Sequence, residues 1–477
     1  MRKISAKKIM RSFLAFLLAA ALFAGHAEGT AKSAKYIFLF IGDGMGTAQR
    51  NAAEVYLAGM REAQGDVAPR EAQLTMNLLP VQGFIRTDSL SGVTDSAAAG
   101  TALAAGRKTQ NGAVAMNPKS GENFVSIAQT ARRMGMKTGI VTSSFLQDAT
   151  PAVFYGHAKK RTEHYALGIQ LIDSGYEYFA GGGFRNPKGR DKKSADLYGI
   201  AASKGYAVIR DLGKPPAAEK VIAVHPKASN GYMPWVIDER GGPSLADLVD
   251  YGIERLDGHD GFFMMVEGAK IDLACHAHDA ASAVRETIAF DEAVGRAVKF
   301  MERRPEPTLI VVTGDHETGG MTLGSLEEMK NTVYDTLSFQ QGSYSVFERR
   351  TASQKGEKMT DGVNAAKKFF GPWIIVTPDI EKAFKLSAMD TKKRKTAAAN
   401  YDKLYSAYDP FTIACMASSN SYCGITWTTF SHTGKHVPVS AAGIQAELFA
   451  GEYENTGICD RILSAMDGGE ETKRGGR

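Results

Sequence analysis

The sequence predicts an α/β fold in which a mostly parallel central sheet carries helices on both faces. Four short apolar runs rich in β-branched and aromatic residues, at 36–41, 138–142, 262–266 and 309–313, are typical of buried strands. Helical stretches such as 123–134 and 280–301 alternate with these runs. Since ligands bind beyond the carboxyl ends of the strands in such folds, we expect functional residues along that edge.

The first 27 residues have the layout of a secretory signal peptide. Residues 1–11 carry five basic and no acidic residues, the apolar run 13–24 follows, and small residues precede a cleavage point near Ala27. An uncleaved anchor is the alternative, but the run is too short to span a bilayer well. Cleavage removes five basic residues from a chain of formal net charge +5, which leaves a nearly neutral periplasmic or secreted protein. We therefore expect no nucleic-acid partner and no membrane association after cleavage.

The rest of the chain divides into a core, an insertion and a tail. We expect the core at 28–323 and 430–466, with a polar, irregular insertion or cap at 324–429 that holds two helices, around 361–370 and 378–385. The Gly-rich, charged tail at 467–477 has a composition typical of disorder. Four cysteines are too few for a disulfide scaffold, although Cys415 and Cys423 could close a small loop after export.

Acidic and oxygen-bearing side chains follow the four predicted strands. They are Asp43, then Asp148 and Thr150, then Glu267, and finally Asp315 and His316. Alone, each is as well explained by a turn, but together they place several carboxylates at one edge of the sheet. Burying this much negative charge requires cations, so the sequence predicts bound metal.

A second signal follows Glu267. Asp272 and His276 are four residues apart, so on a helix they share a face and can hold one ion. Histidine, carboxylate and hydroxyl ligands suit Zn²⁺, whereas an all-oxygen set suits Mg²⁺. Cys275 is a possible soft ligand, but we interpret it as a core residue because it lies about 100° around the helix from His276.

A candidate nucleophile opens an Ala-rich helix at Ser96. Thr94 or Asp95 is available as its N-cap, and the simplest alternative is that Asp95 and Ser96 only cap the helix. At a helix N-terminus, however, Ser96 would meet free backbone N–H groups that favour a phosphoryl group. A serine hydroxyl needs a base or a metal to become nucleophilic, and bound zinc would supply that activation.

Six motifs in order resemble the alkaline phosphatase family, from about Tyr36 to Gly443. They are IGDGMG at 41–46, TDSAA at 94–98, DATP at 148–151, VEGAKID at 266–272 with His276, TGDHETG at 313–319 and HTG at 432–434. The resemblance implies a phosphate monoester hydrolase with a broad substrate range and an alkaline pH optimum. It also implies a phosphoserine intermediate, two Zn²⁺ and one Mg²⁺, and a homodimer.

The same resemblance assigns roles to individual residues. One zinc is expected on Asp272, His276 and His432, and a second, near Ser96, on Asp43, Asp315 and His316. Asp43 is also expected to reach a magnesium site completed by Thr150 and Glu267. Arg161 matches the arginine that clamps phosphate, although Lys159 and Lys160 lie beside it, and Asp148 completes the expected substrate-binding set.

One residue departs from the family pattern. Leu273 stands where relatives often carry Lys, His or Trp, which leaves the magnesium affinity and the pH optimum open. His436 lies close to His432, and we interpret it as an ordinary loop or core histidine. The alternatives are a phosphodiesterase or phosphomutase of the same superfamily, and a non-catalytic metal- or phosphate-binding protein. The sequence does not identify the physiological substrate.

Overall fold

The computed structural model describes residues 33–63, 72–238, 241–324, 334–352, 358–398 and 400–468. The signal peptide predicted at 1–27 lies outside these residues, as does the tail from 469 onward. In the described part of the chain, no helix combines the length and the apolar character needed to cross a bilayer.

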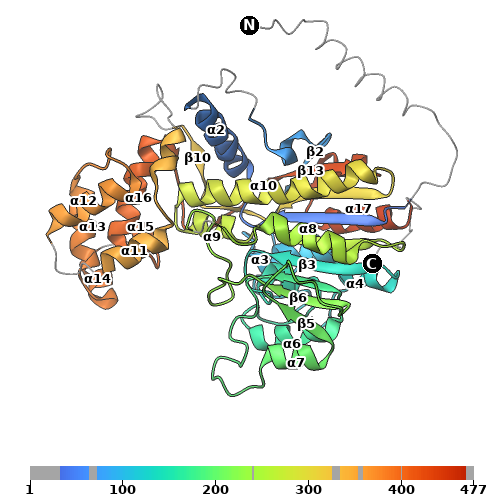
Figure 1. Cartoon of the computed structure of the whole chain (residues 1–477). Coiled ribbons are helices and arrows are strands. Elements are labelled where there is room, and N and C mark those ends of the chain that lie inside the picture. The colour runs from blue at the N-terminus through green and yellow to red at the C-terminus, as the bar shows by residue number, and fades with distance from the viewer. Residues whose placement is uncertain are drawn as a thin grey trace, which may run out of the picture.

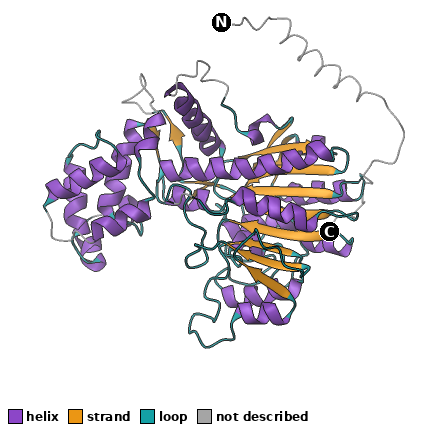
Figure 2. Cartoon of the chain, in the orientation of Figure 1, coloured by secondary structure: helices purple, strands orange, loops and turns teal. Residues whose placement is uncertain are grey.

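A ten-stranded sheet forms the centre of the protein (Figures 1 and 2). Its strand order is β14-β2-β13-β8-β1-β7-β3-β4-β6-β5, and only β13 runs antiparallel to its neighbours. The strands are β1 (Tyr36–Gly42), β2 (Val81–Arg86), β3 (Lys137–Thr142), β4 (Tyr178–Gly181), β5 (Tyr206–Ile209), β6 (Lys220–Val224), β7 (Phe262–Glu267), β8 (Thr308–Gly314), β13 (Val437–Gly443) and β14 (Gly451–Glu454). The predicted fold class is confirmed, and the four predicted strands lie side by side as β8, β1, β7 and β3.

Strand β1 shows why these runs are apolar at every position. Side chains alternate across a sheet, so Ile37 and Leu39 join the hydrophobic cluster on one face while Phe38 and Phe40 join the cluster on the other. Helices bury both faces. The first face is covered by α3 (Ser96–Ala105), α4 (Ile127–Arg133), α5 (Ala149–Ala152), α6 (His164–Ser174), α7 (Leu197–Ser203) and α17 (Thr456–Met466). The second is covered by α2 (Thr47–Ala63), α8 (Leu245–Leu256), α9 (Lys270–His276) and α10 (Ala280–Arg303).

Capping side chains determine where two of the predicted helices begin. The helix predicted at 123–134 begins later, at Ile127, because Ser126 and Gln129 form a reciprocal capping box there. The helix predicted at 280–301 is α10, which Asp279 caps. Three short 3₁₀ helices complete this part of the fold: η2 (Thr75–Leu78), η3 (Tyr334–Phe339) and η4 (Ala446–Phe449).

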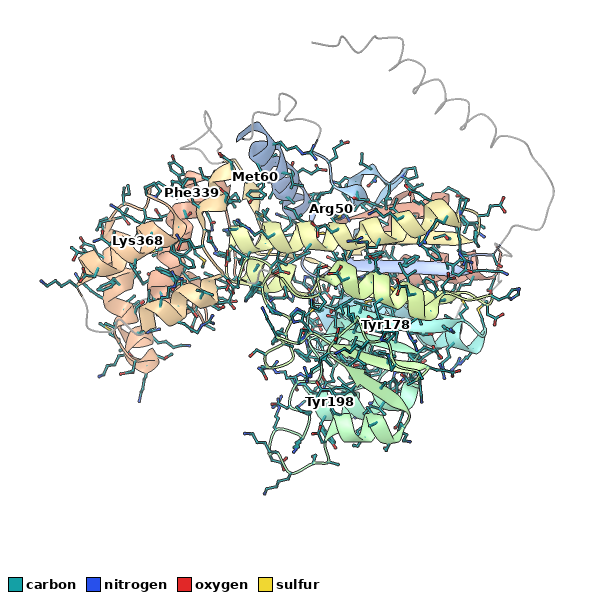
Figure 3. The ribbon with its side chains drawn as sticks, in the orientation of Figure 1. Arg50, Met60, Tyr178, Tyr198, Phe339 and Lys368 are labelled. Atoms are coloured by element: carbon teal, nitrogen blue, oxygen red, sulfur yellow. The ribbon has the colours of Figure 1, made fainter. Side chains whose placement is uncertain are left out.

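The two helices predicted in the insertion are present as α12 (Met359–Phe370) and α13 (Pro378–Ser387), but the region around them is helical and not irregular. A lobe of helices projects from the body in this region (Figure 1). Its members are α11 (Tyr344–Ala352), α12, α13, α14 (Thr391–Ala397), α15 (Tyr401–Tyr405) and α16 (Pro410–Tyr422). The lobe has its own hydrophobic cluster around Phe347, Phe369 and Phe411. Figure 3 labels the exposed Lys368 on this lobe and the fully buried Tyr178 in the body.

Two short antiparallel ladders return the chain from the lobe to the body. β10 (Thr322–Leu323) pairs with β11 (Ile425–Thr426), and β9 (Glu317–Thr318) pairs with β12 (His432–Thr433). The second ladder sets His432 opposite Thr318. His432 therefore lies at the carboxyl edge of the sheet although the whole lobe separates it from β8 in sequence.

The disulfide considered between Cys415 and Cys423 does not form, and all four cysteines are free and buried. Helix α16 explains the separation, because eight helical residues span about 12 Å. A disulfide needs Cα atoms roughly 4.4–6.8 Å apart. Cys415 packs inside the lobe, whereas Cys423 joins the cluster of the body, where its Sγ lies 2.9 Å from Thr336 Oγ1.

We predict that Asp279→Ala destabilises the protein by about 3 kcal/mol, since buried donors would lose their acceptor. The Asp279 carboxylate accepts hydrogen bonds from the backbone N–H of Ser282 at 3.0 Å and of Tyr344 at 2.7 Å, and from Gln340 Nε2 at 2.7 Å. It thereby joins α10 to the start of the lobe. Denaturant unfolding measures the change. The control is Asp390→Ala, which removes an exposed N-cap from α14 and should cost less; equal losses would contradict the prediction.

Candidate active site

Three buried carboxylates meet at the carboxyl ends of adjacent strands. Asp43 follows β1, Glu267 ends β7 and Asp315 follows β8. Asp43 is 6% exposed, and Glu267 and Asp315 are fully buried. Gly44, directly after Asp43, allows the backbone of Asp272 to lie close to this edge. Its φ is +72°, and a Cβ on residue 44 would lie only 2.8 Å from the Asp272 Cα.

Asp272, His276 and His432 form the first cluster. His276 Nε2 lies 3.3 Å from Asp272 Oδ2 and 3.1 Å from His432 Nε2, and His432 Nε2 lies 3.7 Å from Asp272 Oδ1. The other ring nitrogens face carbonyl oxygens: His276 Nδ1 is 2.6 Å from Phe430 O and His432 Nδ1 is 2.8 Å from Thr94 O. When either ring is neutral, these contacts hold its proton on Nδ1 and leave the Nε2 lone pair facing the site.

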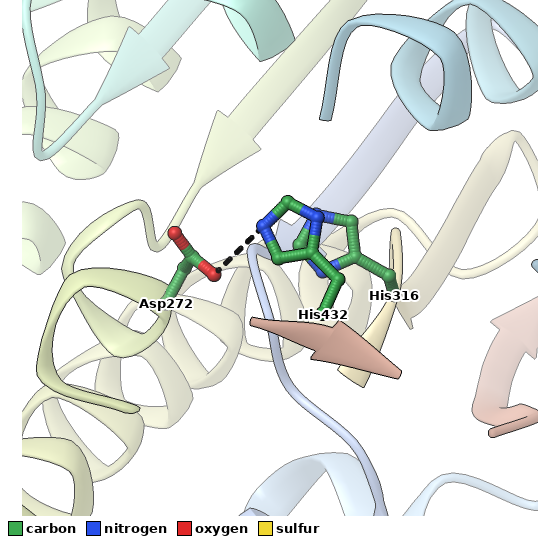
Figure 4. A group of neighbouring side chains, drawn as sticks. All are labelled: Asp272, His316 and His432. Carbon is green, nitrogen blue, oxygen red and sulfur yellow. Dashed lines mark ion pairs between the residues drawn. The ribbon is translucent and has the colours of Figure 1, made fainter. Parts of the chain in front are cut away.

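Asp43, Asp315 and His316 form the second cluster. His316 Nε2 lies 3.6 Å from Asp43 Oδ1 and 3.3 Å from Asp315 Oδ2. His316 also stacks on His432, with ring centroids 3.8 Å apart, and ligand atoms of Asp272, His316 and His432 lie within 4.8 Å of one another. Figure 4 shows these three side chains. His316 thus stands between the two clusters, which the sequence did not predict.

Hydroxyl groups complete a third set beside Asp43. Thr150 Oγ1 donates to Asp43 Oδ2 at 3.4 Å, and Thr142 Oγ1 donates to Glu267 Oε2. Thr142 ends β3, the neighbour of β7, which explains its position beside Glu267. Glu267, Thr150 and Asp43 therefore lie together, as the sequence predicts for the residues assigned to magnesium.

Three carboxylate oxygens in these clusters have no hydrogen-bond partner among the described residues: Asp43 Oδ1, Glu267 Oε1 and Asp315 Oδ2. Burial raises the pKa of Asp315 to about 7 and that of Glu267 to about 8, and neighbouring carboxylates add to both shifts. Burial, with Asp315 and Asp272 nearby, also raises the pKa of Asp43 well above its usual value. Buried oxygens without donors, together with imidazole nitrogens, fit divalent cations, so the residues present suit a metal centre.

Ser96 lies beside these clusters as the first residue of α3. Asp95 is the N-cap, and its side chain accepts from the Ala98 backbone N–H at 3.0 Å. Ser96 is 2% exposed, and its Oγ lies 3.3 Å from His316 Nε2. Capping therefore falls to Asp95, and the Ser96 hydroxyl points toward the candidate metal ligands.

Arg161 is held by two carboxylates. Its guanidinium pairs with Asp95 Oδ2 and Asp148 Oδ1, each at 3.3 Å, and its side chain is 32% exposed. Burial alone would lower its pKa, but Asp148 and Asp95 outweigh that effect and raise it. Lys159 and Lys160 are exposed instead. Among these three basic residues, only Arg161 joins Asp95 to the turn that carries Asp148.

Other predicted residues fall outside the clusters. Cys275 packs in the core with Sγ 3.6 Å from Gln49 Nε2, and His436 is exposed and pairs with Glu452 at 3.4 Å. Leu273 is partly buried and lines a cavity of about 460 Å³.

Three residues of the site were not predicted: Thr142, which donates to Glu267, and two residues that follow His316. Thr318 donates to Asp272 Oδ1 and lies 3.2 Å from His316 Nδ1, so it links the two clusters. Glu317 is buried and accepts from Gln49 Nε2 and the Met321 backbone N–H, each at 3.0 Å. Glu317 and Thr318 belong to the TGDHETG motif at 313–319, and this motif is the sequence feature that could have identified them.

The fold and the clusters define an α/β protein whose candidate metal centre faces a buried serine. The family model described as alkaline phosphatase matches residues 34–171 and 229–467. The chain belongs to the alkaline phosphatase family, and the prediction of an enzyme of this class is confirmed.

Individual relatives agree with this assignment. Alkaline phosphatase 3 of Bacillus subtilis is 30% identical over 452 residues, which cover 92% of this chain and 90% of that protein. The alkaline phosphatase structure from Thermus thermophilus is 27% identical with a TM-score of 0.77, and the match covers 93% and 94% of the two chains. A mutant of the alkaline phosphatase from the Antarctic bacterium TAB5, with magnesium bound in its M3 site, is 25% identical with a TM-score of 0.63, covering 92% and 99%.

We predict that the stability of the metal-free protein falls as the pH rises from 7 to 8. The folded-state pKa of Glu267 is about 8, against roughly 4.3 when unfolded. Burial lowers the pKa of His276, but Asp272 outweighs it and raises the value to about 9, against roughly 6.5 when unfolded. The folded state therefore holds more protons in this range, and each such group costs up to about 1.4 kcal/mol per pH unit.

Thermal unfolding of chelator-treated protein at pH 7.0, 7.5 and 8.0 measures this decline. Glu267→Gln cannot titrate, so its decline should be shallower, and added Zn²⁺ and Mg²⁺ should reduce the wild-type decline. Stability that stays constant or rises over this range would rule out the proposed proton uptake.

Proposed function

We propose that the protein hydrolyses phosphate monoesters through a phosphoserine formed on Ser96. One observation carries this proposal: the Ser96 Oγ at the N-terminus of α3 lies 3.3 Å from His316 Nε2, between the two histidine–carboxylate clusters. The family and the fold support phosphomonoesterase activity. The detailed roles below extend that support to named residues.

We assign one Zn²⁺ to Asp272, His276 and His432, and a second to Asp43, Asp315 and His316. Mg²⁺ would be held by Asp43, Thr150 and Glu267, where hydroxyl and carboxylate oxygens gather. The magnesium in the TAB5 relative supports a magnesium requirement. When bound, such ions lower the pKa of coordinated hydroxyl groups and stabilise entering and leaving oxygens.

The side chains then divide the work of two in-line displacements. The Ser96 hydroxyl gives its proton to solvent and forms a bond to phosphorus as the bond to the alcohol oxygen breaks. The departing alcohol oxygen takes up a proton from solvent. A water molecule next attacks the phosphoserine, which releases phosphate and restores the hydroxyl. Arg161 and the free N–H groups of α3 hold the phosphoryl oxygens, and Asp95 and Asp148 fix the guanidinium for this task.

Several properties follow as parts of the same proposal. We propose a broad substrate range and an alkaline pH optimum, because higher pH favours neutral histidine ligands and a deprotonated serine. The partly buried Leu273 cannot hydrogen-bond to phosphate, so we expect product release to depend little on this position. We also propose export after cleavage near Ala27, and a homodimer.

We predict that Ser96→Ala lowers kcat/KM for p-nitrophenyl phosphate by about 10³-fold or more, because the covalent step is lost. The control is Ser91→Ala, five residues earlier, which should retain activity. A second readout is incorporation of labelled phosphate at acidic pH, expected in the wild type and absent in Ser96→Ala. Activity that survives the loss of Ser96, or turnover of bis-p-nitrophenyl phosphate alone, would favour a different superfamily reaction.

We predict that His432→Ala lowers the zinc content from about two ions per chain to about one and abolishes most activity. The matched control is His436→Ala, four residues later, which removes an exposed imidazole that pairs only with Glu452 among the described residues. Elemental analysis after dialysis, with activity measured in parallel, distinguishes the two variants. Equal zinc content in both would contradict the ligand assignment.

A further inference from the structure

Among the described residues, no carboxylate forms an ion pair with the guanidinium group of Arg185. Arg185 follows β4, and its guanidinium carbon lies 5.1 Å from the ring centroid of Phe145 and 5.9 Å from that of Tyr232. The two rings meet edge to face, with centroids 5.4 Å apart. Arg185 is only partly buried, so this cation is held on an aromatic platform and remains accessible to solvent.

Backbone hydrogen bonds fix this platform to the turn that carries Asp148. The buried Gln147 side chain accepts from the Arg185 N–H at 3.0 Å and donates to the Arg185 carbonyl oxygen at 3.2 Å. The Leu146 N–H donates to the Gly183 carbonyl oxygen at 2.9 Å. Since Gln147 directly precedes Asp148, which pairs with Arg161, the two arginines have a defined relative position.

The charges of Arg185 and Arg161 act on the same neighbours. Burial and, to a smaller extent, Asp148 raise the pKa of Tyr232 to about 12, whereas Arg185 and Arg161 both oppose this rise. Burial lowers the pKa of His164, and Arg185 and Arg161 add to that shift. Tyr232 and His164 therefore lie within electrostatic range of both Arg185 and Arg161, the candidate phosphate clamp.

There is also room beside Tyr232 for a leaving group. Tyr232 lines the cavity of about 460 Å³ whose wall includes Trp235 and Leu273, and Leu273 directly follows the candidate metal ligand Asp272. The basic residues Lys227, Lys270 and Arg349 also line this cavity, whereas Arg185 lies over the Tyr232 ring and is not part of the wall. Arg185 itself lies between residues 172 and 228, which the family model leaves unmatched. The arginine is thus a feature of this chain outside the matched catalytic region.

We propose that Arg185 binds a second anionic group on the leaving group, so that the enzyme prefers phosphate monoesters that also carry a carboxylate or a further phosphate. This inference rests on the proposed function of the same site. A guanidinium forms paired hydrogen bonds with carboxylate and phosphate oxygens, and its aromatic support reduces the entropy lost on binding.

The test uses the zinc- and magnesium-loaded enzyme and two esters that differ at one group. These are 3-phosphoglycerate, which carries a carboxylate, and glycerol 3-phosphate, which has a hydroxymethyl group in its place. The reference ester is p-nitrophenyl phosphate. The variants are Arg185→Gln, Arg185→Lys and the control Arg107→Gln. Arg107 also lies over an aromatic ring, Phe124, but follows the end of α3 opposite Ser96.

We expect the wild type to favour 3-phosphoglycerate, and Arg185→Gln to raise its KM by about tenfold with little change in kcat. The KM for glycerol 3-phosphate should hardly change, Arg185→Lys should keep part of the preference, and Arg107→Gln should keep all of it. An unchanged preference in Arg185→Gln, or an equal loss for all three esters, would overturn the proposal. A wild type that hydrolyses none of the three would instead overturn the proposed function, and this inference with it.

Discussion

Buried negative charge at one edge of the sheet is the constraint on which the rest of the structure depends. Asp272 has imidazole partners, so although burial alone would raise its pKa, His276 and His432 lower it. Asp43, Glu267 and Asp315 have no comparable cationic partners among the described residues, and burial raises their pKa values instead. As the pH rises above these values the carboxylates lose their protons, and bound cations would then compensate the buried charge. We therefore expect metal binding and folding stability to be linked in this protein, because the candidate ligands are themselves destabilising groups.

The fold concentrates these groups in a way that few topologies allow. Parallel strands β8, β1, β7 and β3 lie side by side, so the residues at their carboxyl ends come together although they are far apart in sequence. His432 of the first cluster does not follow a strand of the central sheet. It lies on β12, which comes after the helical lobe and pairs with β9 at the edge of the site. Asp279 then joins α10 to that lobe through buried hydrogen bonds. The lobe therefore adds its own core without separating His432 from the site.

The sequence predicts features that depend on local pattern and misses those that depend on tertiary contact. The central strands were predictable because a strand buried on both faces needs an apolar residue at every position, as in β1. Most helices of the lobe were not, since lysine-rich stretches such as α14 bury few side chains and resemble irregular surface. Cys415 and Cys423 are close in sequence, but a helix holds them apart. The groups that orient His276 and His432 are backbone carbonyl groups. Every residue has one, so the sequence could not identify these partners.

The arrangement around Asp148 suggests how substrate preference can vary while the chemistry stays fixed. Asp148 pairs with Arg161, and both residues lie inside the region that the family model matches. The neighbouring Gln147 accepts a hydrogen bond from the backbone of Arg185, which lies outside that region. A change in the 172–228 segment can therefore alter what lies next to the candidate phosphate clamp without moving a candidate metal ligand. We expect the candidate metal ligands not to vary in this way, because replacing one leaves the other buried charges without compensation. Selectivity for the leaving group is consequently expected to depend on residues such as Arg185, on the solvent side of the site.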